Sequence, residues 1–214
     1  MADQKNIVWI TGATSGIGEA LARQCPWRDT EIISVSRRRH PDFETVPFDL
    51  TDMSSWDAVG AHLRAQEAAG ADLVQLFDSW VGNLSVDEYR VHVMPYTARI
   101  LGSLRGPSIH FGTQTAHLLE LIRDAGGTCV GVDHRIALDE AWERLGHDVP
   151  VQGNLDPALL LGPVDRLLTQ VDDVLRRAAH RPGHLFNLGH GILPETPMEH
   201  VQAVIDHVHS RTRR

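Results

Sequence analysis

Short apolar runs alternate with stretches of helical periodicity along the whole chain. Most of the runs are β-branched or aromatic and are followed by polar residues or glycine, a pattern typical of buried strands in a parallel sheet. We predict eight such strands, at Ile7–Ile10, Glu31–Ser36, Thr45–Phe48, Leu73–Phe77, Ser108–Phe111, Cys129–Val132, Val149–Gly153 and Leu185–Leu188.

Apolar residues recur at helical spacing between these strands, which predicts helices that pack on the sheet. The stretch Ser85-Val86-Asp87-Glu88 has the form of a capping box, in which serine and glutamate satisfy each other's backbone N–H groups. The connection from Arg37 to Glu44 contains Pro41 and is too short for a helix. The predicted helices are Ser54–Ala69, Ser85–Leu104, Thr115–Ala125, Ala137–Leu145 and Ala158–Ala178.

Repeated strand–helix units imply an α/β protein with a parallel sheet. Eight strands are the number that closes a (β/α)8 barrel of the TIM type, so we expect this fold in a single composite domain over residues 1–214. The alternative is an open doubly wound sheet, and periodicity does not separate the two.

Composition narrows the classes of partner and chemistry. The formal charge of −8 argues against nucleic acid as a partner. The only lysine is Lys5, and the two cysteines, Cys25 and Cys129, form no CxxC pair, which favours a cytoplasmic protein without a disulfide framework. No apolar run is long enough to span a membrane, and the histidines lack metal-ligand spacing. We expect a monomer or homodimer without metal.

The segment Thr11–Gly18, TGATSGIG, joins the first strand to a helix and predicts a phosphate or dinucleotide site. Its glycines allow a tight turn and a close backbone approach to a pyrophosphate at the helix N-terminus. An arginine after the second strand suits the 2′-phosphate of NADP(H), and an Asp-Leu pair after the third suits an adenine ring. The candidate cofactor-binding residues are Gly12, Ser15, Gly16, Ile17, Gly18, Arg37, Asp49 and Leu50.

These residues resemble the N-terminal part of a short-chain dehydrogenase/reductase, over about residues 1–60. The resemblance implies an NADP-dependent oxidoreductase fragment. The Tyr-x-x-x-Lys pair of that family is absent, because Tyr89 is followed at the fourth place by Val93 and Tyr96 by Ile100. We therefore expect no hydride transfer and no required cofactor, with NADP(H) as an optional ligand.

Polar groups and glycines cluster after apolar strands in the rest of the chain, in the phrases Gln75–Gly82, Pro95-Tyr96, Gln152–Pro157, Phe186–Gly191 and Pro194–Val201. With these phrases, about residues 60–214 resemble the C-terminal half of uroporphyrinogen decarboxylase. The resemblance implies a cofactor-independent (β/α)8 barrel that removes carboxylates from the acetate side chains of a tetrapyrrole. It also implies that Ser79 and His190 match the serine and histidine of the substrate pocket, and that Gln152–Pro157 is a structural loop. Together the two resemblances imply a Rossmann-like fragment over residues 1–60 and a half-barrel over residues 61–214 of the composite domain.

Departures from both families lead to the expected function. The family's arginine-rich segment, its aspartate and its mid-chain tyrosine lie in the half of the decarboxylase that has no counterpart here, and His134 stands where the family has tryptophan. We therefore expect an engineered chimera that tests fold recombination and has no intact parental activity. The alternatives are an NADP(H)- or phosphate-binding module and residual tetrapyrrole binding with very weak decarboxylation.

Overall fold

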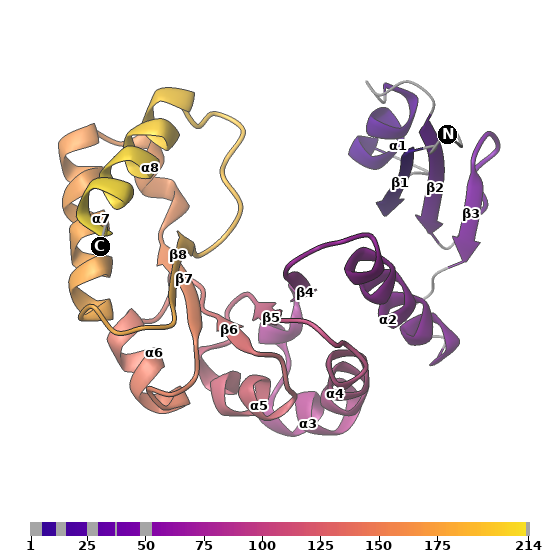
Figure 1. Cartoon of the computed structure of the whole chain (residues 1–214), viewed down its shortest axis with the longest axis horizontal. Coiled ribbons are helices and arrows are strands. Elements are labelled where there is room, and N and C mark those ends of the chain that lie inside the picture. The colour runs from indigo at the N-terminus through magenta and orange to yellow at the C-terminus, as the bar shows by residue number, and fades with distance from the viewer. Residues whose placement is uncertain (1–5, 12–15, 25–29, 37, 48–52, 213–214) are drawn as a thin grey trace. The chain divides into compact units, whose positions relative to one another are not determined.

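A computed structural model describes residues 6–11, 16–24, 30–36, 38–47 and 53–212 of the chain (Figure 1). The chain divides into two compact units, Met1–His62 and Leu63–Arg214. The single composite domain stays a prediction.

The first unit contains a parallel sheet of three strands in the order β1-β2-β3. The strands are β1 (Asn6–Thr11), β2 (Thr30–Ser36) and β3 (Glu44–Pro47), and α1 (Gly16–Arg23) follows β1. Residues 38–43 contain no helix, as predicted. In this turn the His40 N–H donates to Thr45 Oγ1 at 2.8 Å, and the Asp42 N–H donates to His40 Nδ1 at 3.0 Å. The helix α2 (Met53–Ala68) spans the boundary between the units.

The second unit contains a parallel sheet of five strands in chain order, β4-β5-β6-β7-β8. The register pairs Leu76 with His110 and Val130 with Val151. The structure confirms the five strands predicted for this part of the chain. Because they are parallel, their carboxyl ends lie at one edge of the sheet. The strands are β4 (Val74–Asp78), β5 (Ser108–Gly112), β6 (Cys129–Gly131), β7 (Val151–Leu155) and β8 (His184–Leu188).

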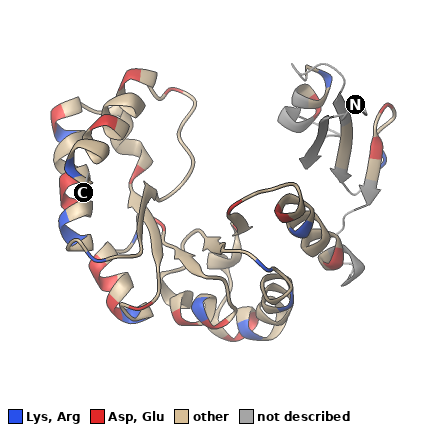
Figure 2. Ribbon diagram, in the orientation of Figure 1, with Lys and Arg blue, Asp and Glu red and all other residues tan. Residues whose placement is uncertain are grey.

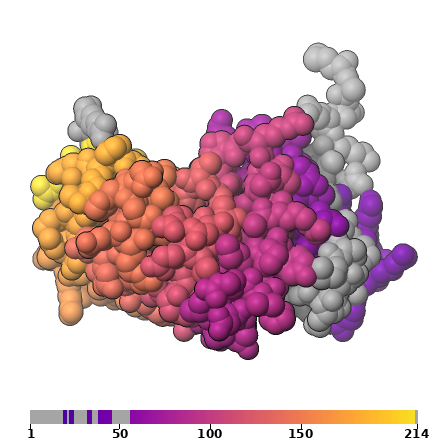
Figure 3. Space-filling model, turned by 90° about the horizontal axis from the view of Figure 1, so that it is seen from below, coloured from indigo at the N-terminus to yellow at the C-terminus, as the bar shows by residue number. Residues whose placement is uncertain are grey.

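Helices cover one face of this sheet (Figure 1), and successive segments follow one another across the surface in Figure 3. Most of the charged residues of the unit lie on these helices (Figure 2). Tyr89, Ile122, Leu138 and Trp142 are fully buried in the core between the helices and the sheet. Burial of each such apolar side chain contributes roughly 1.5–3 kcal/mol. The helices are α3 (Val86–His92), α4 (Met94–Gly102), α5 (Leu119–Asp124), α6 (Leu138–Leu145), α7 (Val164–Ala178) and α8 (Met198–Thr212), with 3-10 turns η1 (Val81–Asn83), η2 (Ala116–Leu118) and η3 (Pro157–Leu161).

Three predicted helices are divided in the structure. The single helix expected over 85–104 is wrong, because the backbone turns at Val93 (φ −121°, ψ −53°) and α4 begins beside Pro95. Proline has no N–H to donate and its ring crowds the preceding turn. For the same reason the helix expected over 158–178 becomes η3 and α7, divided at Gly162-Pro163. The helix expected over 115–125 begins as the 3-10 turn η2 and continues as α5.

The capping box is confirmed. The Glu88 N–H donates to Ser85 Oγ at 3.3 Å, and the Ser85 N–H donates to Glu88 Oε2 at 3.0 Å. This reciprocal pair satisfies two backbone donors that the first turn of α3 cannot satisfy itself.

The parallel α/β class is confirmed for the second unit. In the described part of the chain, the eight strands form two separate sheets, of three and five strands. Closure into a (β/α)8 barrel, like the doubly wound alternative, stays a prediction. Over the same residues, no helix combines the length and the apolar character needed to cross a membrane.

Candidate functional site

The loops after β4, β5, β6 and β8 contact one another at the carboxyl edge of the five-stranded sheet. Ser79 directly follows β4, and its carbonyl oxygen accepts a hydrogen bond from Thr113 Oγ1, just beyond β5. Gly82 packs on the same segment, because a Cβ atom there would lie 2.2 Å from the Thr113 carbonyl oxygen. Ser79 is half-buried, whereas the Trp80 side chain beside it is 79% exposed.

A buried carboxylate, Asp133, connects the β5 loop to the loop after β6. Asp133 Oδ2 accepts from the Gln114 N–H at 2.5 Å and from Arg135 Nη1 at 2.8 Å. Its Oδ1 accepts from the Arg135 N–H at 3.0 Å. Three donors, one of them the guanidinium group of Arg135, thus compensate the burial of this charge, as a buried carboxylate requires. This role was not predicted from the sequence. An aspartate directly after a short apolar strand could nevertheless have indicated a polar group at the carboxyl edge of the sheet.

The end of β7 is tied to the same loop. Asn154 Nδ2 donates to the carbonyl oxygens of Asp133 at 2.9 Å and Ile136 at 2.7 Å. Asp156 caps η3, with Oδ1 accepting from the Ala158 N–H at 2.9 Å. Both side chains bond to backbone groups, which agrees with the structural role expected for the Gln152–Pro157 loop.

His190 follows β8, and the backbone before it packs on the β6 loop. The Gly189 N–H donates to the Leu155 carbonyl oxygen at 2.7 Å. A Cβ atom at Gly189 would lie 2.3 Å from the His134 backbone nitrogen, so only glycine fits. His190 is exposed. His134 is half-buried, with Nε2 3.9 Å from Asp156 Oδ1.

Ser79 and His190 therefore lie on loops at the same edge, after β4 and β8. The contacts that connect the two loops run through Thr113, Gln114 and Asp133 to Gly189. This edge offers a half-buried hydroxyl and an exposed imidazole, both of which can donate hydrogen bonds to an anionic ligand. Among the described residues, no group of three His, Cys, Asp or Glu side chains could hold a metal ion.

The candidate cofactor residues fall largely outside the described part of the chain. Gly16, Ile17 and Gly18 lie in the first turn of α1, the helix that follows β1 along the chain. The described backbone thus has the predicted order of strand and helix. The candidates outside the described residues are Gly12, Ser15, Arg37, Asp49 and Leu50.

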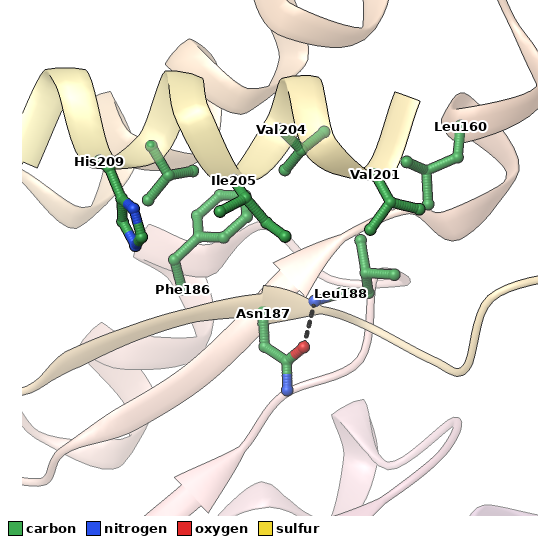
Figure 4. A pocket seen from close by; sticks show the side chains of 9 residues that line it. Leu160, Phe186, Asn187, Leu188, Val201, Val204, Ile205 and His209 are labelled. Carbon is green, nitrogen blue, oxygen red and sulfur yellow. Dashed lines mark hydrogen bonds between the residues drawn. The ribbon is translucent and has the colours of Figure 1, made fainter. Parts of the chain in front are cut away.

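An apolar cavity of about 280 Å³ lies between β8 and α8 (Figure 4). Below it in Figure 4, the Leu188 N–H donates to Asn187 Oδ1 at 2.8 Å. The lining offers one group for acid–base chemistry, His209. The lining residues are Leu160, Phe186, Asn187, Leu188, Val201, Val204, Ile205, Val208 and His209.

The fold and the placement of these loops define a parallel α/β protein whose candidate site lies at the carboxyl ends of the strands, as in barrel enzymes. Solved structures of similar fold support this class. A methyltransferase from Methanosarcina mazei superimposes with a TM-score of 0.66 at 18% identity, covering 92% of this chain and 63% of that protein. A B12-independent methionine synthase from Shewanella sp. W3-18-1 gives 0.56 at 12% identity, covering 85% and 63%. These likenesses concern the fold alone.

The family model of uroporphyrinogen decarboxylase (URO-D) matches residues 53–211. The chain therefore belongs to the uroporphyrinogen decarboxylase family. The uroporphyrinogen decarboxylase of Sorangium cellulosum is 59% identical over 154 residues, which are 71% of this chain and 44% of that protein. That of Arthrobacter sp. FB24 is 48% identical over 209 residues, 95% of this chain and 59% of that protein. The chain thus spans about half the length of these relatives.

The expectation of an inert engineered chimera is wrong. One natural decarboxylase, from Arthrobacter, aligns with 95% of the chain, so its match reaches beyond the second unit into the first. The family match also begins within the first unit, at residue 53. The comparisons do not support a short-chain dehydrogenase origin or NADP(H) binding for the first 60 residues. The prediction of a short-chain dehydrogenase fragment rested on local glycine, arginine and aspartate patterns, and such short motifs recur in many α/β turns.

Proposed function

We propose that this chain acts on a tetrapyrrole as a uroporphyrinogen decarboxylase, with the loops after β4 and β8 forming one side of the substrate site. The observation that carries the proposal is the family match over residues 53–211, combined with the position of Ser79 and His190 on one edge of the sheet. In this reaction the bond between the acetate methylene and its carboxylate breaks. CO2 leaves, and the methylene carbon takes a proton to become a methyl group.

Ser79 and His190 have the chemistry to hold substrate carboxylates. Each can donate a hydrogen bond to a carboxylate oxygen, and bonds to charged groups are stronger than neutral ones. Ser79 is held through its carbonyl group by Thr113, so its position relative to β5 is defined. His190 extends into solvent from a backbone that is packed tightly on the β6 loop.

The test uses the full chain with uroporphyrinogen as substrate and coproporphyrin as a binding probe. We expect formation of coproporphyrinogen, and we expect Ser79→Ala and His190→Ala each to lower kcat/KM by about 10- to 100-fold, the value of one hydrogen bond to a charged group. His180→Ala, an exposed histidine on the loop before β8, is the matched control and should leave kcat/KM unchanged. Absence of both turnover and saturable coproporphyrin binding would exclude this function.

A further inference from the structure

A buried pair of polar side chains lies beneath Ser79, between the sheet and its helices. Asp78 is the last residue of β4, and His110 lies in β5 beside it. His110 Nε2 and Asp78 Oδ2 are 2.8 Å apart, and the two side chains are 0% and 9% exposed. Groups buried this deeply keep their charge only when they are paired and hydrogen-bonded.

The hydrogen bonds of His110 determine where its protons lie. Nδ1 is 3.0 Å from the Ile122 carbonyl oxygen, which can only accept, so Nδ1 carries a proton. Nε2 faces the Asp78 carboxyl group, so a further proton lies between Nε2 and Oδ2. The Thr97 hydroxyl also donates to Oδ2, at 3.1 Å. With the shared proton on Nε2, Oδ2 accepts from two donors and His110 is an imidazolium, an arrangement in which both ring N–H groups of His110 and the Thr97 hydroxyl group have a partner.

The elements around the pair supply one more titratable group. Tyr89 in α3 is fully buried, and in the described part of the chain its hydroxyl has no hydrogen-bond partner. Burial raises the pKa of Tyr89, and the negative charge of Asp78 raises it further. Tyr89 is therefore a neutral phenol at physiological pH. Thr97 in α4 and the Ile122 carbonyl group in α5 are the uncharged neighbours described above.

The pair is linked to Ser79 through the backbone of β4 and β5. The Asp78 side chain is held by His110, and the next carbonyl group, that of Ser79, is held by Thr113 Oγ1. Gly112 packs closely here, because a Cβ atom there would lie 3.0 Å from the Asp78 carbonyl oxygen. The end of β4 is thus attached to β5 on both sides of the Asp78–Ser79 peptide bond.

We propose that His110 and Asp78 form a buried imidazolium–carboxylate pair that positions Ser79 for its ligand. Both are positioning residues, because they act through the backbone of Ser79. Loss of the shared proton would leave a carboxylate facing a nitrogen lone pair, and their repulsion would move the end of β4 away from β5. The role of Ser79 in ligand binding rests on the function proposed above.

NMR of the full chain with 15N-labelled histidine tests the protonation directly. In the wild type at pH 7, we expect both ring nitrogens of His110 to be protonated, and an unprotonated Nε2 would overturn the proposal. In Asp78→Asn the side-chain amide can donate to a neutral ring, so the second proton should be lost. Tyr89→Phe is the matched control, because the Tyr89 hydroxyl has no hydrogen-bond partner among the described residues and its removal should leave the ring doubly protonated.

The positioning role is tested through the Ser79 amide resonance. At pH 7, His110→Gln, which cannot carry the positive charge, should shift the Ser79 amide resonance relative to the wild type, whereas Tyr89→Phe should leave it unchanged. A Ser79 amide resonance that is the same in His110→Gln and in the wild type contradicts the positioning role. Asp78→Asn should also weaken coproporphyrin binding about tenfold, as a displaced binding group does. If wild-type chain binds no coproporphyrin, the proposed function fails, while the spectra still decide on the pair.

Discussion

At the scale of single residues, the candidate site depends on positions where a side chain would not fit. Gly189 packs on the loop that contains Asp133 and His134, whereas a Cβ atom at Gly191, two residues later, would meet no heavy atom within 4 Å. The two glycines flank His190. Substitution of Gly189 therefore tests the packing contact, whereas substitution of Gly191 tests only the loss of backbone freedom.

We expect Gly189→Ala to lower the free energy of unfolding of the second unit by about 1–3 kcal/mol, the usual cost of overpacking. Gly191→Ala should change it by less than about 0.5 kcal/mol, as surface substitutions do. Urea unfolding followed by circular dichroism compares them. Equal effects of the two substitutions would contradict the close contact between Gly189 and His134.

Cys129 is a second residue-scale feature, a thiol buried in the middle of the sheet beside Ile109 and Phe111. Burial raises its pKa to about 12. At pH 8 the thiol is therefore protonated, and the thiolate is the reactive form.

In a Cys25→Ser background, which leaves Cys129 as the single cysteine, we expect Cys129 to react with a disulfide reagent at pH 8 at least about 100-fold more slowly in the native protein than in denaturant. Absorbance of the released thiolate measures both rates. Similar rates in the two conditions would show that β6 is accessible in the native state.

At the scale of elements, salt bridges join adjacent helices of the outer layer. Arg177 of α7 contacts Asp139 of α6 at 2.8 Å and Asp173 of its own helix at 2.7 Å. Hydrogen bonds from Arg177 hold the pKa of both carboxyl groups below their usual range. Arg90, paired with Asp87 within α3, is a more exposed comparison.

Arg177→Met should lower the free energy of unfolding at pH 7 by up to about 1 kcal/mol, the range for exposed ion pairs. Carboxyl groups with a depressed native pKa stabilise the fold above their unfolded value, about 3.9, and this contribution disappears as the pH falls through the native value. The difference between Arg177→Met and wild type should therefore shrink below about pH 4. Arg90→Met should show a smaller difference, and a pH-independent effect of Arg177→Met would assign it to packing.

Element boundaries show how far local patterns predict structure. The strand bounds follow from β-branched runs and agree closely with the structure. The capping box could be predicted from the identities of Ser85 and Glu88 alone. The division of helices at Pro95 and at Gly162-Pro163 was missed because apolar periodicity continues across both positions. Helix α8 was not predicted, although Val201, Val204, Ile205 and Val208 recur at helical spacing.

At the scale of the whole molecule, the five-stranded sheet ends at β8. In the described part of the chain, β8 pairs with β7 alone. The Leu188 N–H bonds to the side chain of Asn187, whereas the Val132 N–H, in the middle of the sheet, donates to the Gln152 carbonyl oxygen at 2.8 Å. A closed barrel would give β8 a second neighbouring strand.

Hydrogen exchange measured by NMR distinguishes these arrangements. We expect the amides of Phe186 and Leu188, on the side of β8 away from β7, to exchange at least about tenfold faster than the amide of Val132. The Val151 N–H, which donates to the Gly183 carbonyl oxygen at 2.9 Å, is the protected control near the same strand. Comparable protection of Phe186, Leu188 and Val132 would indicate that a further strand pairs with β8.

The sequence by itself determined the eight strands, the parallel α/β class and two candidate site residues at the ends of strands, Ser79 and His190. The strands and the fold class follow from local patterns, because strand and turn preferences depend on neighbouring residues. The two site residues follow from a family resemblance carried by short phrases. Only the tertiary structure decided how Thr113, Asp133, Asn154 and Gly189 connect the loops and that His110 faces Asp78. Hydrogen bonds between residues 19 to 34 positions apart in the chain, and the packing of Gly189 on His134, exist only once the strands are aligned.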